Sequence, residues 1–144
     1  MPVENYFKIK SVDTVLTPAN RFFNLVEVNV DVDEIIEISS DVCFELQDSF
    51  TGMDPLLYIE TKDTATSTKL LVSATKFVDS AAASGAIRCG TVSWKGAIVE
   101  DGTISVWVRG NSVEDGNITV LANVSNVSYK IWEDGYTSPD DDSA

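Results

Sequence analysis

Five aromatic and basic residues in the second half of the sequence carry the chemistry of a binding surface. Trp107 and Arg109 alternate with aliphatic residues along one apolar stretch, Lys130 and Trp132 do so along another, and Trp94 ends a third. Tryptophan and arginine are enriched at the centres of protein interfaces, and an exposed aromatic row can also stack on sugar rings. We therefore predict that these residues bind a partner. The alternative is that the rings cap a barrel end or pack under a loop.

Catalytic chemistry has little support in the sequence. The 144 residues include no histidine, which removes Ser-His and Cys-His pairs and the imidazole general base. A pair of carboxylates is still available among the 23 acidic residues. A carboxylate-based hydrolase would need an open cleft lined by two acids whose pKa values are shifted in opposite directions. We predict no catalytic residues and no enzymatic activity, with this hydrolase as an alternative.

One acidic segment matches part of a calcium-binding loop. Asn29, Asp31 and Asp33 occupy the first, third and fifth ligand positions of an EF-hand. Glu34 stands where that loop requires glycine, and Ser40 stands where it requires a bidentate glutamate, so a solvated strand face explains the pattern better. The sequence also lacks a phosphate-binding glycine loop. We predict no metal and no cofactor; weak cation binding at clustered Glu-Asp-Gly turns remains an alternative.

The charge of the chain excludes some partners. It has 23 acidic and 10 basic residues, which give a net charge of -13. A field of this sign repels nucleic acid and anionic membranes, so neither is predicted as a partner. Residues 1–60 hold 12 acids and 3 bases, residues 61–132 hold 6 and 7, and residues 133–144 hold 5 and 0. The acidic ends indicate surfaces with different roles, or they simply maintain solubility.

Cys43 and Cys89 are the only cysteines, and each lies in an apolar alternating segment. Two cysteines do not make a disulfide framework, so we predict buried free thiols, and a bridge only if their strands are neighbours. The N-terminal residues show neither a basic nor an apolar leader, and no apolar stretch is long enough to span a membrane. We therefore expect neither secretion by a signal peptide nor a membrane span.

Alternation with a period of two dominates the sequence and predicts β-strands. The segments that alternate cleanly are residues 26–33, 42–47, 104–109 and 127–132. Less regular runs, rich in β-branched or aromatic residues, lie at residues 6–9, 56–60, 69–78, 86–94 and 117–122. No segment shows a sustained helical stripe, and residues 79–84 are the best candidate for a short helix or a loop.

The connections between these runs predict how the strands are joined. Glu-Asp-Gly occurs at residues 100–102, 114–116 and 133–135, and Asp-Gly favours tight hairpins because both residues tolerate positive φ. The C-terminal half is therefore expected to be a hairpin meander. Residues 61–68 and the tail at 137–144 are expected to be mobile, because neither buries enough apolar surface.

These elements predict an all-β fold. About nine short strands without a helical crossover indicate a single-domain antiparallel β-sandwich or a Greek-key or jelly-roll barrel. The domain is expected to span residues 1–136, followed by the acidic flexible tail at residues 137–144.

In style the chain resembles a small virion protein of a tailed bacteriophage, of the capsid decoration or cement type. The resemblance rests on a signal-less β domain, a histidine-free acidic composition, Ser/Thr/Ala-rich loops at residues 61–68 and 79–86, and the tail at residues 140–144. Such proteins commonly sit as oligomers on a shell and brace it. The resemblance implies that role, and no functional residue is carried over from it.

Our leading hypothesis is therefore a non-enzymatic structural protein of a virus particle that contacts its own copies and a capsid shell protein. A rigid scaffold, interfaces for its copies and strong outward charge suit such a role. If the chain is not viral, we expect a protein without a signal peptide. The alternative is a carbohydrate-binding β-sandwich module that uses Trp94, Trp107 or Trp132 as a stacking platform.

Overall fold

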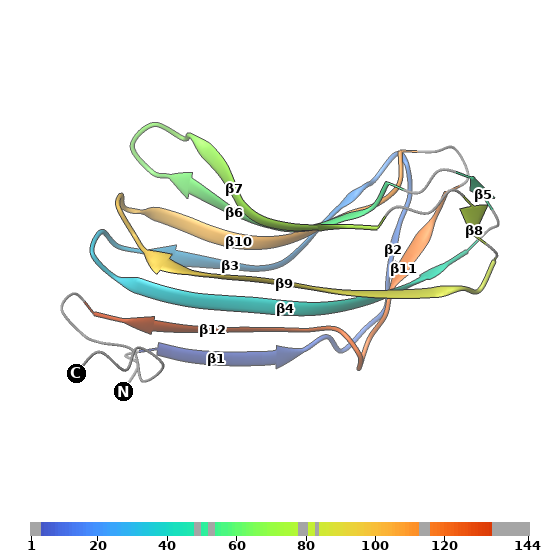
Figure 1. Ribbon diagram of the computed structural model, residues 1–144, viewed down its shortest axis with the longest axis horizontal. Coiled ribbons are helices and arrows are strands. Elements are labelled where there is room, and N and C mark those ends of the chain that lie inside the picture. Colours follow the sequence, from blue (N-terminus) through green and yellow to red (C-terminus); the bar gives the residue numbers. More distant parts are fainter. Residues whose placement is uncertain are drawn as a thin grey trace.

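The computed structural model describes residues 4–47, 50–51, 54–77, 81–82, 84–112 and 116–133 (Figure 1). Every regular element in this part of the chain is a β-strand. The strands are β1 (Glu4–Ile9), β2 (Thr14–Leu16), β3 (Phe22–Val30), β4 (Ile35–Leu46), β5 (Phe50–Thr51), β6 (Leu56–Asp63), β7 (Lys69–Lys76), β8 (Ala81–Ala82), β9 (Ile87–Ala97), β10 (Gly102–Arg109), β11 (Ile118–Val120) and β12 (Asn126–Trp132). The all-β prediction is confirmed, and each stretch with strand character in the sequence corresponds to one of these strands.

The long strands form two antiparallel sheets that face each other (Figure 1). One sheet has the order β1-β12-β4-β9, and β2 and β11 continue β1 and β12 beside the second half of β4. The other has the order β3-β10-β6-β7. This order is that of a jelly roll, in which two Greek keys fold over each other. The predicted β-sandwich is therefore confirmed in its jelly-roll form.

The core fills the space between the sheets. Inward-facing residues alternate with outward-facing ones, and fully buried aliphatic side chains from both sheets include Ile36, Ile38, Val42, Leu57, Ile59, Ile104, Val106, Val108 and Val120. Burying one such side chain stabilises the fold by roughly 1.5–3 kcal/mol. Val32, which continues the alternation of β3 in the sequence, lies beyond the end of that strand and is 46% exposed.

β4 organises the larger sheet and is longer than its sequence pattern predicts. One side of β4 pairs with β9, and the other side pairs with β12 and then with β11. The sequence pattern began only at Val42, because the polar Ser40 interrupts the apolar series. Ser40 nevertheless points inward at 1% exposure, and its hydroxyl donates a hydrogen bond of 2.6 Å to the Asn126 carbonyl oxygen. A buried polar group is tolerated there because it has a partner.

The Glu-Asp-Gly segments do not form the expected hairpin meander. β9 and β10 lie in different sheets, and so do β10 and β11, so residues 100–102 cross from one sheet to the other. In the described part of the chain, positive φ occurs at Asp33, Ser67, Gly85 and Asn123, and not at residues 101 and 102. The second and third tripeptides lie partly outside the described residues. Asp-Gly predicted a local turn, whereas the sheet topology is set by pairing between distant strands.

Glycine at position 102 serves a close approach between strands. A Cβ atom there would lie 2.0 Å from the carbonyl oxygen of Lys62 on the neighbouring strand β6. Asp101 ties the same corner together. Its Oδ1 accepts a hydrogen bond of 2.8 Å from the Val32 N–H, and its carbonyl oxygen accepts one of 3.0 Å from the Thr64 N–H. The tripeptide therefore joins three neighbouring connections at one end of the sandwich.

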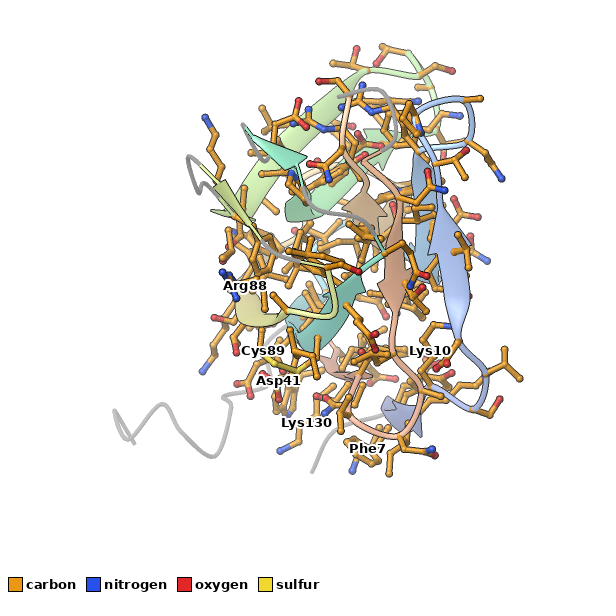
Figure 2. The ribbon with its side chains drawn as sticks, turned by 90° about the vertical axis from the view of Figure 1, so that its right-hand side faces the viewer. Phe7, Lys10, Asp41, Arg88, Cys89 and Lys130 are labelled. Atoms are coloured by element: carbon orange, nitrogen blue, oxygen red, sulfur yellow. A yellow bond between two sulfur atoms is a disulfide. The ribbon has the colours of Figure 1, made fainter. Side chains whose placement is uncertain are left out.

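Cys43 and Cys89 form a disulfide, so the prediction of free buried thiols is wrong. The two residues lie directly opposite each other on β4 and β9, and Cys89 is exposed on the outer face (Figure 2). Their separation of 46 residues concealed the pairing. Alternation assigns a residue to one face of a strand but does not identify the neighbouring strand.

Residues 61–68 form the end of β6 and its turn into β7, and their expected mobility stays a prediction. The Asp63 carbonyl oxygen accepts a hydrogen bond of 2.8 Å from the Ser67 N–H, and the Asp63 N–H donates one of 2.9 Å to the Thr68 carbonyl oxygen. Backbone hydrogen bonds thus hold a segment that buries few apolar atoms. Within the helix candidate at residues 79–84, Ala81 and Ala82 form strand β8, so the helix alternative is wrong there; residues 79, 80 and 83 lie outside the described residues. The tail at residues 137–144 lies wholly outside them. No helix in the described part could cross a membrane.

Candidate functional site

The five residues predicted to bind a partner occupy three separate places. Trp107 and Arg109 lie on the outer face of the four-stranded sheet, because the residues that alternate with them on β10 point into the core. Lys130 and Trp132 take the corresponding positions on β12 in the other sheet. Trp94 packs against the core between the sheets. The jelly roll therefore does not bring the five together.

An aromatic cluster covers part of the outer face of the four-stranded sheet. Trp107 lies opposite Tyr58 on β6 and Asn24 on β3. Its ring meets Phe22 edge to face, with centroids 6.5 Å apart and planes at 85°, and its Nε1 donates a hydrogen bond of 2.9 Å to the Ser105 hydroxyl. Trp107 is half-buried and Phe22 is exposed. Trp107 therefore faces outward from the four-stranded sheet, and its role in partner binding stays a prediction.

Arg109 is tied to Asp54 at the end of this cluster. Its Nη2 donates a hydrogen bond of 3.2 Å to the Asp54 carbonyl oxygen. The Asp54 carboxylate accepts hydrogen bonds from the N–H and hydroxyl of Ser112, and lies 3.8 Å from Arg21 Nη2. Burial alone would raise the pKa of Asp54, but the Ser112 hydrogen bonds and the two guanidinium groups outweigh it, and the pKa is lowered. Because the Asp54 carboxylate stays ionised, it is better suited to holding the neighbouring segments together than to donating a proton.

Lys130 and Trp132 differ in exposure although they share a strand face. Lys130 is exposed and lies between Asn5 on β1 and Glu37 on β4. Trp132 is 1% exposed, so its ring does not provide an exposed stacking platform. Alternation correctly predicted that both side chains lie on the same face of β12. It did not predict that Trp132 is buried at the end of the strand.

A further surface, which sequence reasoning did not single out, is the β1 edge, defined as residues 4–16. Among the described residues β1 pairs only with β12, and β2 only with β11, so one side of this edge has no neighbouring strand. Phe7, Ile9 and Val15 point to its outer face with 63%, 50% and 51% exposure, and Val12 is 65% exposed. Phe7 projects at the lower margin of Figure 2, where Lys130 also lies. Apolar residues on both faces of a short strand were the signal available in the sequence.

Trp94 lines a pocket of about 320 Å³ at the end of the sandwich where β6 turns into β7. Strands of both sheets contribute to its wall, which is mainly apolar. Besides Trp94, the lining includes Val30, Leu70, Val72, Ile98 and Thr103. A concave, largely apolar space with a few polar groups is the usual form of a small-molecule site.

The acidic segment that resembled a calcium loop is used to shape the backbone between β3 and β4. The Glu34 carboxylate accepts a hydrogen bond of 2.7 Å from the Asp31 N–H, and Asp33 adopts a φ of 74°. In the described ranges no three histidine, cysteine, aspartate or glutamate side chains gather as metal ligands. The weak cation site at the Glu-Asp-Gly segments involves residues outside those ranges and stays a prediction.

No family model matches the sequence, and no curated protein is similar to it. Several solved structures share its fold. A chain from the Gt strain of infectious bursal disease virus has a TM-score of 0.54 and 12% identity over 93% of this chain and 34% of that one. VP2 from a subviral particle of the same virus has a TM-score of 0.53 and 10% identity over 94% and 34%. The Eiger TNF of S. frugiperda has a TM-score of 0.50 and 9% identity over 78% and 68%.

These likenesses establish the fold alone. The present chain spans about a third of the length of the viral chains that it matches. Its architecture is that of an antiparallel β-sandwich.

Proposed function

We propose that this protein is a non-enzymatic structural subunit of a virus particle and that it assembles through contacts between its own copies. The observation that carries the proposal is the β1 edge, where an unpaired strand side coincides with the exposed apolar residues Phe7, Ile9 and Val15. An exposed, apolar edge strand is a template for pairing with another chain. In a stable protein such an edge is usually covered, and a second copy would cover it symmetrically.

The charges on β1 favour pairing with a second copy. The chain carries a net charge of -13, which opposes self-association in general, but the β1 edge contains two acids, Glu4 and Asp13, and two bases, Lys8 and Lys10. In an antiparallel pair centred on Tyr6, Glu4 of one copy lies opposite Lys8 of the other, and the reverse contact forms by symmetry. Opposite charges in directly facing positions stabilise a strand pair.

Two other observations support a place on a particle. The chains from infectious bursal disease virus particles have the same fold, and they include VP2. The Cys43–Cys89 disulfide also fits an oxidising location, such as a virion surface. A shell-bracing role would use these features without catalysis, nucleic acid or membrane contact.

The oligomeric state tests the assembly step. We expect sedimentation velocity to detect a dimer or a larger species whose population rises with concentration. Replacing the apolar outer face with Phe7→Ser and Ile9→Ser should shift the protein toward monomer. Ile87→Ser is the matched control, because Ile87 is 53% exposed on β9 at the opposite edge of the same sheet. A wild-type protein that stays monomeric throughout would contradict the proposal.

A charge swap tests the proposed register. Glu4→Lys alone would place two lysines opposite each other at both ends of the pair and should weaken the dimer. Adding Lys8→Glu restores opposite charges and should restore dimerisation. Recovery in the double variant is expected only if these positions face each other, so a double variant as monomeric as Glu4→Lys would reject this register.

Electron microscopy of native virus particles, labelled with an antibody against this chain, tests the proposed location. Particles that the antibody does not label would contradict a place on the particle.

A further inference from the structure

In the pocket beside Trp94, the indole ring lies over Gly96 of the same strand, a contact that the sequence analysis did not predict. A Cβ atom built on Gly96 would lie 2.6 Å from Cζ2, 2.9 Å from Cη2 and 3.2 Å from Cε2 of the Trp94 ring. An approach to the ring edge would bring one atom clearly closer than its neighbours, so position 96 lies over the face of the ring. The indole therefore rests flat on the Gly96 backbone, and its opposite face is directed away from β9. Glycine at position 96 makes room for this placement.

The walls around the ring combine apolar and polar groups. Leu70 and Val72 from β7 and Ile98 beyond the end of β9 supply apolar surface, and the space measures about 320 Å³. This volume is at the small end of ligand pockets, which range from roughly 300 to 1,000 Å³. The pocket therefore suits one or two ring-sized groups rather than a long chain.

The polar lining narrows the chemistry of the occupant. Thr61 lies opposite the buried Ile104, so it points between the sheets and contributes a hydroxyl group, which both donates and accepts hydrogen bonds. Asp63 and Glu100 contribute carboxylates. The pocket lining holds these two acids and one basic residue, Lys62. This charge balance disfavours an anionic ligand. A neutral polyhydroxylated ring fits best, since its C–H face packs on the electron-rich face of an indole and its hydroxyl groups meet the polar lining.

We propose that this pocket binds a neutral sugar residue, with the Trp94 ring as the stacking platform and the Thr61 hydroxyl and the Asp63 and Glu100 carboxylates as hydrogen-bonding groups. The site lies between β6, β7 and β9, at the end of the sandwich where the β6–β7 turn projects in Figure 1. It does not use the β1 edge. Sugar binding and self-association are therefore separable, and a monomeric variant should bind sugar as the wild type does.

The test is a titration of the purified protein with maltose, cellobiose and xylobiose, followed by tryptophan fluorescence and calorimetry. We expect saturable binding of at least one of them. Gly96→Ala should tilt the ring off the strand, Thr61→Val should remove one hydroxyl at nearly constant volume, and each should weaken binding by about tenfold. Trp107→Phe, which changes the outer face of the four-stranded sheet and not the space between the sheets, should leave binding unchanged.

Three outcomes would overturn the proposal. One is the absence of binding by all three sugars to a folded wild-type protein. Another is binding that survives in Gly96→Ala and Thr61→Val while Trp107→Phe abolishes it, which would place the platform on the outer face. The third is displacement of the bound sugar by tetramethylammonium at lower concentration than by free sugar, because the carboxylates and the indole would then form a cation site. Circular dichroism of each variant confirms that it remains folded.

Discussion

Tyr129 links the β1 edge to the core at the scale of single residues. Its ring stacks on Tyr6 with centroids 4.9 Å apart, and its hydroxyl donates a hydrogen bond of 2.9 Å to the Glu4 carboxylate. Burial, followed by the hydrogen bond to Glu4 and the charge of Glu4, raises the pKa of Tyr129 from 10.0 to about 12. The protonated phenol is therefore part of what holds β1 on β12.

This raised pKa predicts a loss of stability at alkaline pH. Between pH 10 and about 12 the unfolded chain has released the Tyr129 proton and the folded chain has not, so the unfolded state binds fewer protons. The stabilisation that Tyr129 provides should therefore be fully present below pH 10, and the free energy of unfolding should fall by on the order of 2 kcal/mol through that window. Urea denaturation at several pH values measures it. Tyr129→Phe should remove this part of the slope, and an unchanged slope would contradict the assignment.

The disulfide predicts a second residue-level effect. It closes a loop across a separation of 46 residues and restricts the unfolded chain. Replacing both cysteines, Cys43→Ser with Cys89→Ser, should lower the free energy of unfolding by about 2–4 kcal/mol. Denaturation of the wild type with and without reductant provides the matched comparison. Labelling of the native, unreduced protein by a thiol reagent at both positions would show that the bond does not form.

At the scale of elements, the crossing between β9 and β10 depends on backbone proximity. The Gly102 position on β10 is pressed against the Lys62 carbonyl of β6, and Asp101 binds the connections on either side. The sequence correctly predicted a change of direction at residues 100–102, but it predicted a tight hairpin, whereas the chain crosses between the two sheets there. A glycine that follows aspartate can serve a tight hairpin or a close contact between strands, and only the neighbouring strand distinguishes the two.

The close contact predicts a clear difference between two substitutions at this crossing. Gly102→Ala should lower the free energy of unfolding by about 1–3 kcal/mol, because the added methyl group forces β10 and β6 apart. Asp101→Asn retains a side-chain oxygen for the Val32 N–H and should cost less than about 0.5 kcal/mol. Urea denaturation of both variants checks the pair. Equal and small effects would mean that position 102 is not crowded.

At the scale of the whole molecule, the fold is held by strands from distant parts of the chain. Glu4 on β1 lies opposite Ile131 on β12, and Ile118 on β11 lies opposite Leu16 on β2. The first strand therefore reaches its place only when the last strand is formed. The exposed β1 edge is a consequence, since no further strand follows on its other side among the described residues.

This topology predicts slow folding. Non-local pairing requires closure of long loops before contacts stabilise the chain, so refolding should take roughly milliseconds to seconds. Stopped-flow refolding with the disulfide intact measures the rate. Reduction of the disulfide should slow folding, because β4 and β9 must then find each other unaided. Refolding within microseconds would be inconsistent with the topology.

Local pattern predicted more of the fold than of the candidate sites. The alternation of Ile104, Val106 and Val108 identified β10 and its buried face, and the same rule placed Trp107 on the outer face. It failed to show that Trp132 is covered, because covering depends on what packs over the strand end. It also left Gly96 without a role until the Trp94 ring was seen to lie on it.

The sequence by itself determined the all-β class, the buried face of each main strand and the absence of histidine chemistry, since these follow from side-chain period and composition. The tertiary structure decided which strands are neighbours. That choice created the Cys43–Cys89 bridge, the free β1 edge and the Trp94 pocket. The physical reason is that a period of two fixes the direction of a side chain, whereas strand pairing is settled by long-range closure and by the joint burial of both sheets.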